Sequence, residues 1–240
     1  SLKELKSQYS GSKLNIWWAV VNPLLLALSI NLIFVNAFKV DMPNYTFFVL
    51  SGIIPWMYFS NAILSVTSSF ARNSSILKQG IFVPEVVVIS TILSSFFVFL
   101  IGLVVLLPLF IVLKFKVLFT LLFLVLPIIL QTFFIIGLGF FFLTWNIFSR
   151  DIQYFLFIGL MIWFWVTPVF YSVEMLPHPY RLISFLNPMS YFVILYRQIL
   201  FEGQLPSLVV LLQSFFFAFL FFFTGYLFFL KMEPEILKRV

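Results

Sequence analysis

The sequence predicts an all-α integral membrane protein with six transmembrane helices in a single domain over residues 1–240. Composition is the first reason: 63% of the residues are hydrophobic and 9% are charged, whereas a soluble domain carries about 25% charged residues. The second reason is that the charges leave six uncharged runs, each longer than the roughly 20 residues with which a helix crosses a membrane. Strands of a membrane barrel would be about 10 residues long with alternating polarity, and these runs have neither property.

The predicted elements follow one another between polar breaks. Residues 1–13 form an expected amphipathic helix that lies at the membrane interface ahead of the first span. A longer loop over residues 72–85 joins the second span to the third, whereas the connections after the third and fourth spans are short. The predicted spans are residues 15–38, 46–70, 86–113, 118–145, 152–171 and 206–230.

Residues 172–204, between the last two spans, have a different pattern. The uncharged run at 182–196 is too short to cross a membrane, and it contains Asn187-Pro188, a pair that breaks a helix. We therefore expect external re-entrant helices that lie on, or dip into, the outer leaflet. Backbone at membrane depth that is not a spanning helix must be covered by protein or face water, so this segment is a candidate gate or lid.

The basic residues predict the orientation. With both termini in the cytoplasm, nine of the 14 Lys and Arg residues flank spans on the cytoplasmic side and five lie outside, as the positive-inside rule favours. The net charge of +6 is explained by these flanking residues, and no basic stripe suggests nucleic acid as a partner.

The sequence offers no chemistry of its own. It has one histidine, His178, and no cysteine, which is too few ligands for a metal site. The acidic residues lie at span ends or in loops, so no span centre carries the ionisable group that marks a proton pathway. No phosphate-binding loop of the form G-x-x-x-x-G-K-[ST] occurs. We expect no enzyme active site, and any transport must draw its energy from a partner.

Aromatic residues make up 21% of the chain. Trp and Tyr usually anchor a protein at membrane interfaces, but several here lie well inside predicted spans, where a polar ring edge needs a partner. Stacked rings suit the apolar faces of sugars, although packing is the commoner role for any one of them. Prolines within spans, as in Asn22-Pro23 and Thr167-Pro168, kink helices and can shape a cavity. The candidate channel residues are Trp56, Tyr58, Phe59, Tyr154, Trp163, Trp165 and Tyr171.

Four segments, in the same order along the chain, carry a family resemblance. They are Tyr9–Leu14 with Trp17 or Trp18 and Asn22-Pro23-Leu24; Ser51–Trp56 with Phe59, Asn73, Leu77-Lys78 and Phe82; Asn146–Asp151 with Pro168–Tyr171; and Tyr180-Arg181 with Asn187-Pro188-Met189 and Tyr196-Arg197. Together they resemble the permease family of ATP-binding-cassette exporters for polysaccharides, of the O-antigen and teichoic acid type. Asn15 and the Phe82–Glu85 segment depart from the family pattern.

The resemblance implies a channel-forming permease, without catalysis of its own, in the bacterial inner membrane. Two copies would form a homodimer that carries two cytoplasmic ATPase subunits, which bind ATP and Mg²⁺, so this chain itself needs no cofactor. The substrate would be a lipid-linked polysaccharide. By resemblance, a coupling helix within 72–85 and the surface beside it contact the ATPase through Arg72, Asn73, Ser74, Ile76, Leu77, Lys78, Phe82, Arg150 and Asp151. The gate residues are Pro177, Arg181, Asn187, Pro188, Tyr196 and Arg197.

Three other functions remain open from the sequence. An exporter of drugs or lipids would have the same fold but would not need a continuous aromatic channel. A membrane-embedded transferase would use acids or histidine near the lipid interface, for which His178, Glu174 and Glu202 are the candidates. A scaffold subunit would carry no ATP-dependent flux.

Overall fold

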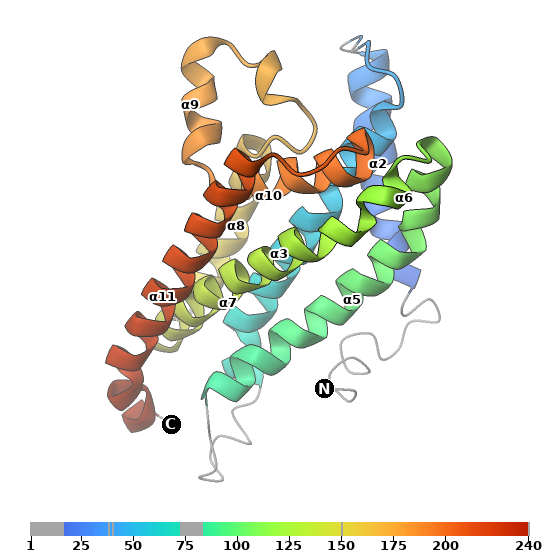
Figure 1. Cartoon of the computed structure of the whole chain (residues 1–240). Helices are drawn as coiled ribbons and strands as arrows, with labels where there is room; N and C mark the ends of the chain where they lie inside the picture. Colours follow the sequence, from blue (N-terminus) through green and yellow to red (C-terminus); the bar gives the residue numbers. More distant parts are fainter. Residues whose placement is uncertain (1–16, 38, 40, 73–83, 150, 240) are drawn as a thin grey trace.

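The computed structural model describes residues 17–37, 39, 41–72, 84–149 and 151–239. All regular elements within these ranges are helices, as predicted, and the long ones form one bundle (Figure 1). Five stretches are long and apolar enough to cross a membrane. They belong to α2 (Trp18–Asn36), α3 (Tyr45–Arg72), α5 (Pro84–Leu113), the continuous run α6 (Val117–Thr120), η2 (Leu121–Leu124) and α7 (Val125–Phe148), and α11 (Leu208–Arg239).

These stretches agree closely with five of the predicted spans. The fourth span differs in detail, because the 3₁₀ turn η2 interrupts it and α7 begins only at Val125. Such tight turns are common as connectors at helix ends. The last span differs in length, since α11 continues beyond residue 230 to Arg239.

The prediction of a helix over 152–171 is wrong at its C-terminal end. The helix α8 (Ile152–Val166) has 15 residues, about 22 Å at 1.5 Å per residue, which is short of a hydrocarbon core of about 30 Å. Thr167 is extended, with φ −84° and ψ 137°, because the proline ring of Pro168 disfavours helical geometry in the preceding residue. The chain therefore leaves the helix inside the predicted span.

Two helices separated at Asn187 follow, as the Asn-Pro pair predicts. They are α9 (His178–Leu186) and α10 (Pro188–Arg197), preceded by the 3₁₀ turn η3 (Val173–Met175) and followed by the π-helical turn η4 (Gln198–Glu202). In Figure 1, α10 lies across the upper end of the bundle and α9 rises beyond it. The start of α5 and the end of α11 lie at the opposite end.

Small residues allow the long helices to approach closely. A Cβ atom built on Gly225 of α11 would overlap the carbonyl group of Gly137 on α7, and one built on Gly102 of α5 would lie 2.8 Å from the carbonyl oxygen of Ala19 on α2. Glycine at such contacts replaces side-chain packing by backbone packing, which is typical of membrane helices. The α7–α11 pair therefore has no space for any larger side chain at either glycine.

Buried polar side chains join the helices to one another. Gln131 of α7 donates to the carbonyl oxygen of Pro55 on α3 at 2.8 Å, and Asn146 of α7 donates to that of Thr67 on α3, also at 2.8 Å. Thr120 donates to the carbonyl oxygen of Ile199 at 2.9 Å and so ties α6 to η4. Away from water an unsatisfied polar group is costly, so these bonds help to fix the relative position of the helices.

Candidate functional site

Three of the predicted channel residues meet where α3 packs against α8. The ring centroids of Trp56 and Phe59 lie 5.5 Å apart, those of Phe59 and Trp163 5.1 Å, and those of Trp56 and Trp163 6.4 Å. Trp56 is 5% exposed and Phe59 is fully buried. The structure therefore brings these side chains together as a closed aromatic cluster, and their part in a channel stays a prediction.

Asn187 connects this cluster to the candidate gate. Its Oδ1 atom accepts hydrogen bonds from the indole Nε1 of Trp163 at 2.7 Å and from the backbone N–H of Met189 at 3.0 Å, and its Nδ2 donates to Thr167 Oγ1 at 2.9 Å. The bond to Met189 makes Asn187 the N-cap of α10, a position that favours asparagine. One amide thus fixes the start of α10 to the end of α8.

The remaining predicted channel residues are divided between three places. The hydroxyl of Tyr171 donates to the carbonyl oxygen of Val166 at 2.7 Å, which folds the ring back onto the end of α8. Tyr154 and Trp165 are 65% and 58% exposed on α8, on the broad outer face of a helix whose buried residues are Leu156 and Leu160. Tyr58 points from α3 toward α7, where its hydroxyl lies 3.0 Å from Thr132 Oγ1.

Arg197, a predicted gate residue, is buried behind the break after α8. One of its terminal nitrogens donates to the carbonyl oxygens of Pro168 and Val169, at 2.8 and 2.9 Å, and its guanidinium carbon lies 3.7 Å from the centroid of the Phe48 ring. The hydroxyl of Tyr45 donates to the carbonyl oxygen of Phe170. The end of α8 leaves these carbonyl groups without helical donors, and a guanidinium can supply several donors in one plane. Arg197 and Tyr45 thus stabilise the non-helical segment 168–170.

The other gate residues organise the loop ahead of α9. Arg181 donates to the carbonyl oxygens of Leu176 and Glu174, at 3.0 and 2.9 Å. Pro177 follows Leu176 in this loop and is the N-cap residue of α9. Tyr196 is fully buried in α10, with its ring edge-on to that of Phe99 at 6.2 Å. Both gate arginines therefore act on backbone carbonyl groups.

A charged cavity lies beside the gate. It has a volume of about 510 Å³, and its lining includes Lys114, Glu174 and Glu202. Burial raises the pKa of the Glu202 carboxyl, while the positive charges of Arg197 and Lys114 act in the opposite direction. Segments that line it, around residues 42–44, 113–114 and 172–175, lie at the end of the bundle that carries α10 (Figure 1).

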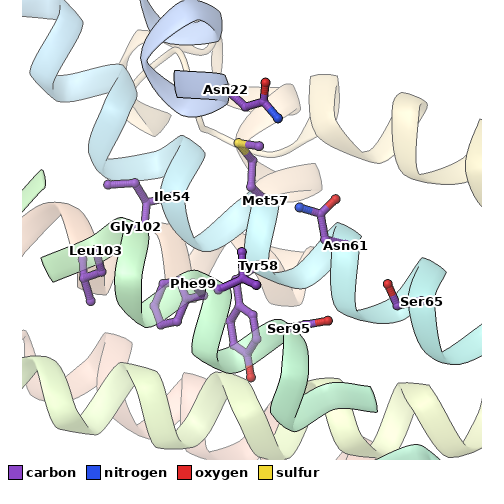
Figure 2. Close-up of a pocket in the computed structure, with 11 residues that line it drawn as sticks. Asn22, Ile54, Met57, Tyr58, Asn61, Ser65, Ser95, Phe99, Gly102 and Leu103 are labelled. Atoms are coloured by element: carbon purple, nitrogen blue, oxygen red, sulfur yellow. The ribbon is translucent and has the colours of Figure 1, made fainter. Parts of the chain in front are cut away.

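A second cavity, of about 260 Å³, lies between α2, α3 and α5 (Figure 2). Its polar lining consists of the amides of Asn22 and Asn61 and the hydroxyls of Ser65 and Ser95, beside the rings of Tyr58 and Phe99. Asn22 was predicted to help shape a cavity through the following proline. Asn61, Ser65 and Ser95 were not predicted, although the spacing of Asn61 and Ser65 places them on one face of a helix and could have revealed them.

The predicted ATPase-contact residues lie almost entirely outside the described part of the chain. Arg72 is the last residue of α3, and Asp151 is the N-cap of α8. Outside the described residues are Asn73, Ser74, Ile76, Leu77, Lys78, Phe82 and Arg150, as is the predicted interface helix over 1–13. The described chain resumes at Pro84, which begins α5, and Glu85 lies in the first turn of this helix.

The described residues contain no group of three or more His, Cys, Asp or Glu side chains that could hold a metal ion. His178, one of the transferase candidates, begins α9.

Comparison with known proteins agrees with the sequence resemblance. The profile of the ABC-2 type transporter family matches residues 1–201. Two proteins of Klebsiella pneumoniae, each named O-antigen export system permease protein RfbA, are 31% and 32% identical to this chain over 85% of its length and 79% of theirs. A protein of the same name from Myxococcus xanthus is 29% identical, over 85% of this chain and 80% of its own. The chain is therefore a multi-pass membrane protein that belongs to the ABC-2 type transporter family.

Proposed function

We propose that the chain is the channel-forming permease subunit of an ATP-driven exporter that moves a lipid-linked, O-antigen-like polysaccharide out of the cytoplasm across the bacterial inner membrane. The observation that carries this proposal is the sequence similarity to the two Klebsiella permeases, which extends over 85% of the chain. Export of a polar chain also fits a bundle that keeps exposed aromatic rings on α8 and a polar cavity between α2, α3 and α5.

We assign α8 as a sixth span of this single permease domain, completed by the non-helical segment after Thr167. Such a segment is compatible with membrane depth because Arg197 and Tyr45 satisfy its carbonyl groups. Six spans put both termini on one side, which the distribution of basic residues assigns to the cytoplasm. The helices α9 and α10 are then the external gate.

A second copy of the chain completes the channel in this proposal. The outer face of α8 is apolar and largely exposed, with Tyr154 and Trp165 at its two ends. A homodimer that places this face toward a central path would give the exposed rings a glycan to contact.

The energy comes from two ATP-binding subunits, which are the expected partners of the ABC-2 family and which bind ATP and Mg²⁺. In the proposed assembly they contact the 72–85 loop and the Arg150-Asp151 turn. This loop follows α3 and precedes α5 in the chain, so a force on it acts on two helices that line the polar cavity.

Export from reconstituted vesicles that contain the chain and its ATPase tests the proposal. Substitution of the exposed Trp165 by Ala should lower polysaccharide export, whereas the matched substitution Phe216→Ala, at an exposed ring of α11, should not. Deletion of residues 74–80 should abolish the complex with the ATPase. Transport of lipids or drugs without glycan by the wild type would favour the alternative exporter, and an intact, active complex after the deletion would refute the coupling assignment.

A further inference from the structure

Two asparagine side chains line the polar cavity between α2, α3 and α5. In a span that faced lipid, apolar side chains would be expected at these positions. Asn22 and Asn61 are both exposed, and neither amide forms a hydrogen bond with another of the described residues. An amide without a partner in hydrocarbon costs several kcal/mol. Polar side chains in spans therefore generally face the bundle interior, a water-filled path or a bound molecule.

A polar stripe leads from this cavity along α3. Asn61, Ser65 and Ser68 are the polar residues on the accessible side of this stretch, whereas Ala62, Ile63, Val66 and Thr67 are buried. The stripe runs toward the end of α3 at Arg72, where the 72–85 loop begins. A polar substrate that enters at the cytoplasmic end would follow hydroxyl groups to the cavity.

The lining of the cavity fits a neutral ligand. It carries amides and hydroxyls but no Lys, Arg, Asp or Glu side chain, and phosphate recognition normally uses Arg or Lys. Next to the polar groups, the rings of Tyr58 and Phe99 stack with centroids 4.6 Å apart. An apolar wall beside amide donors and acceptors is the arrangement that a sugar ring needs.

We infer that this cavity is a carbohydrate subsite, in which the amides of Asn22 and Asn61 hydrogen-bond to hydroxyl groups of one sugar residue of the exported chain. Its volume of about 260 Å³ lies just below the range of about 300–1,000 Å³ of small-molecule sites, which suits one ring rather than a chain segment. The inference rests on the proposed export function and identifies where in this chain the glycan is held.

The test uses the complex of the full chain with its ATPase. The double variant Asn22→Leu/Asn61→Leu keeps the approximate side-chain volume and removes both amides. The control is Asn36→Leu, an exposed asparagine of the same helix α2 whose amide donates to the carbonyl oxygen of Leu32 outside the cavity. The probes are a fluorescent polyprenyl diphosphate that carries a short neutral oligosaccharide and the same lipid without sugar.

The double variant should bind the glycolipid at least about tenfold more weakly, which corresponds to about 1.4 kcal/mol, with unchanged affinity for the sugar-free lipid and unchanged basal ATP hydrolysis. Asn36→Leu should match the wild type, and Asn61→Gln should recover part of the affinity.

Unchanged glycolipid binding in the double variant would overturn the subsite. An equal loss for the sugar-free lipid would assign the site to the carrier headgroup, and dissociation into single copies would assign the amides to an interchain contact; either result overturns the inference. A wild-type complex that binds no glycolipid would instead refute the proposed function itself.

Discussion

The two sides of α3 differ in their side chains and in their accessibility. On one side, Trp56 and Phe59 pack against Trp163 in a closed cluster. The indole N–H of Trp163 donates a hydrogen bond to Asn187. On the other side, Asn61 and Ser65 line an open cavity with amide and hydroxyl groups. In the single chain, Trp56, Phe59 and Trp163 are thus packed against one another, and the accessible polar surface of α3 lies on its opposite face.

The largest effect is expected at Arg197, which supports the non-helical segment after α8. Substitution by Ala removes the donor to the carbonyl oxygens of Pro168 and Val169, and each buried group left unsatisfied costs about 1–3 kcal/mol. Loss of the stack on Phe48 adds to this penalty. We expect the largest fall in the thermal unfolding midpoint of the purified protein in detergent.

Arg181→Ala is the matched control, because Arg181 also donates to two carbonyl oxygens but lies only partly buried near the surface. It should lower the midpoint much less. Equal effects of the two substitutions would contradict the special role of the buried arginine.

The next largest effect separates packing from channel lining. Trp56→Ala should reduce the free energy of unfolding by about 3–5 kcal/mol, as is usual when a large buried aromatic side chain is removed. Trp165→Ala, at a position that is 58% exposed, should leave the unfolding midpoint nearly unchanged while it lowers export. If Trp56→Ala kept full stability and lost only export, the cluster would be a substrate surface that opens during transport.

The sequence predicts the spans well because hydropathy reports which segments lipid can cover. It overextends the fifth span because hydropathy does not register the break at Thr167-Pro168, where the residues remain apolar. It cannot tell which face of a span is open, so Trp56 and Trp165 look equivalent although one is buried and the other exposed. Arg197 looks like an external charge, since its partners, the carbonyl groups after α8, are 28 and 29 residues away in the chain.

A smaller effect is expected at the link between the cluster and the gate. Trp163→Phe keeps the ring contacts but removes the hydrogen bond from Nε1 to Asn187 Oδ1, and interhelical hydrogen bonds in membranes contribute about 0.6–2 kcal/mol. We expect a modest loss of stability together with faster hydrogen exchange at the start of α10. Trp165→Phe, at an exposed indole of the same helix, serves as the control and should change neither quantity.

The smallest effect concerns Glu202, which lines the charged cavity beside the gate. Burial raises the pKa of its carboxyl, with Arg197 and Lys114 acting against the shift. A group whose pKa is higher in the folded state stabilises the fold below its unfolded pKa, and this contribution is lost as the pH rises through the raised value. Glu202→Gln, which stays neutral, should therefore slightly raise the unfolding midpoint at pH 8 relative to wild type, with the difference disappearing below pH of about 4, near the ordinary pKa of a glutamate. A variant that is less stable than wild type at pH 8 would show that the attraction of Glu202 to Arg197 and Lys114 outweighs its burial.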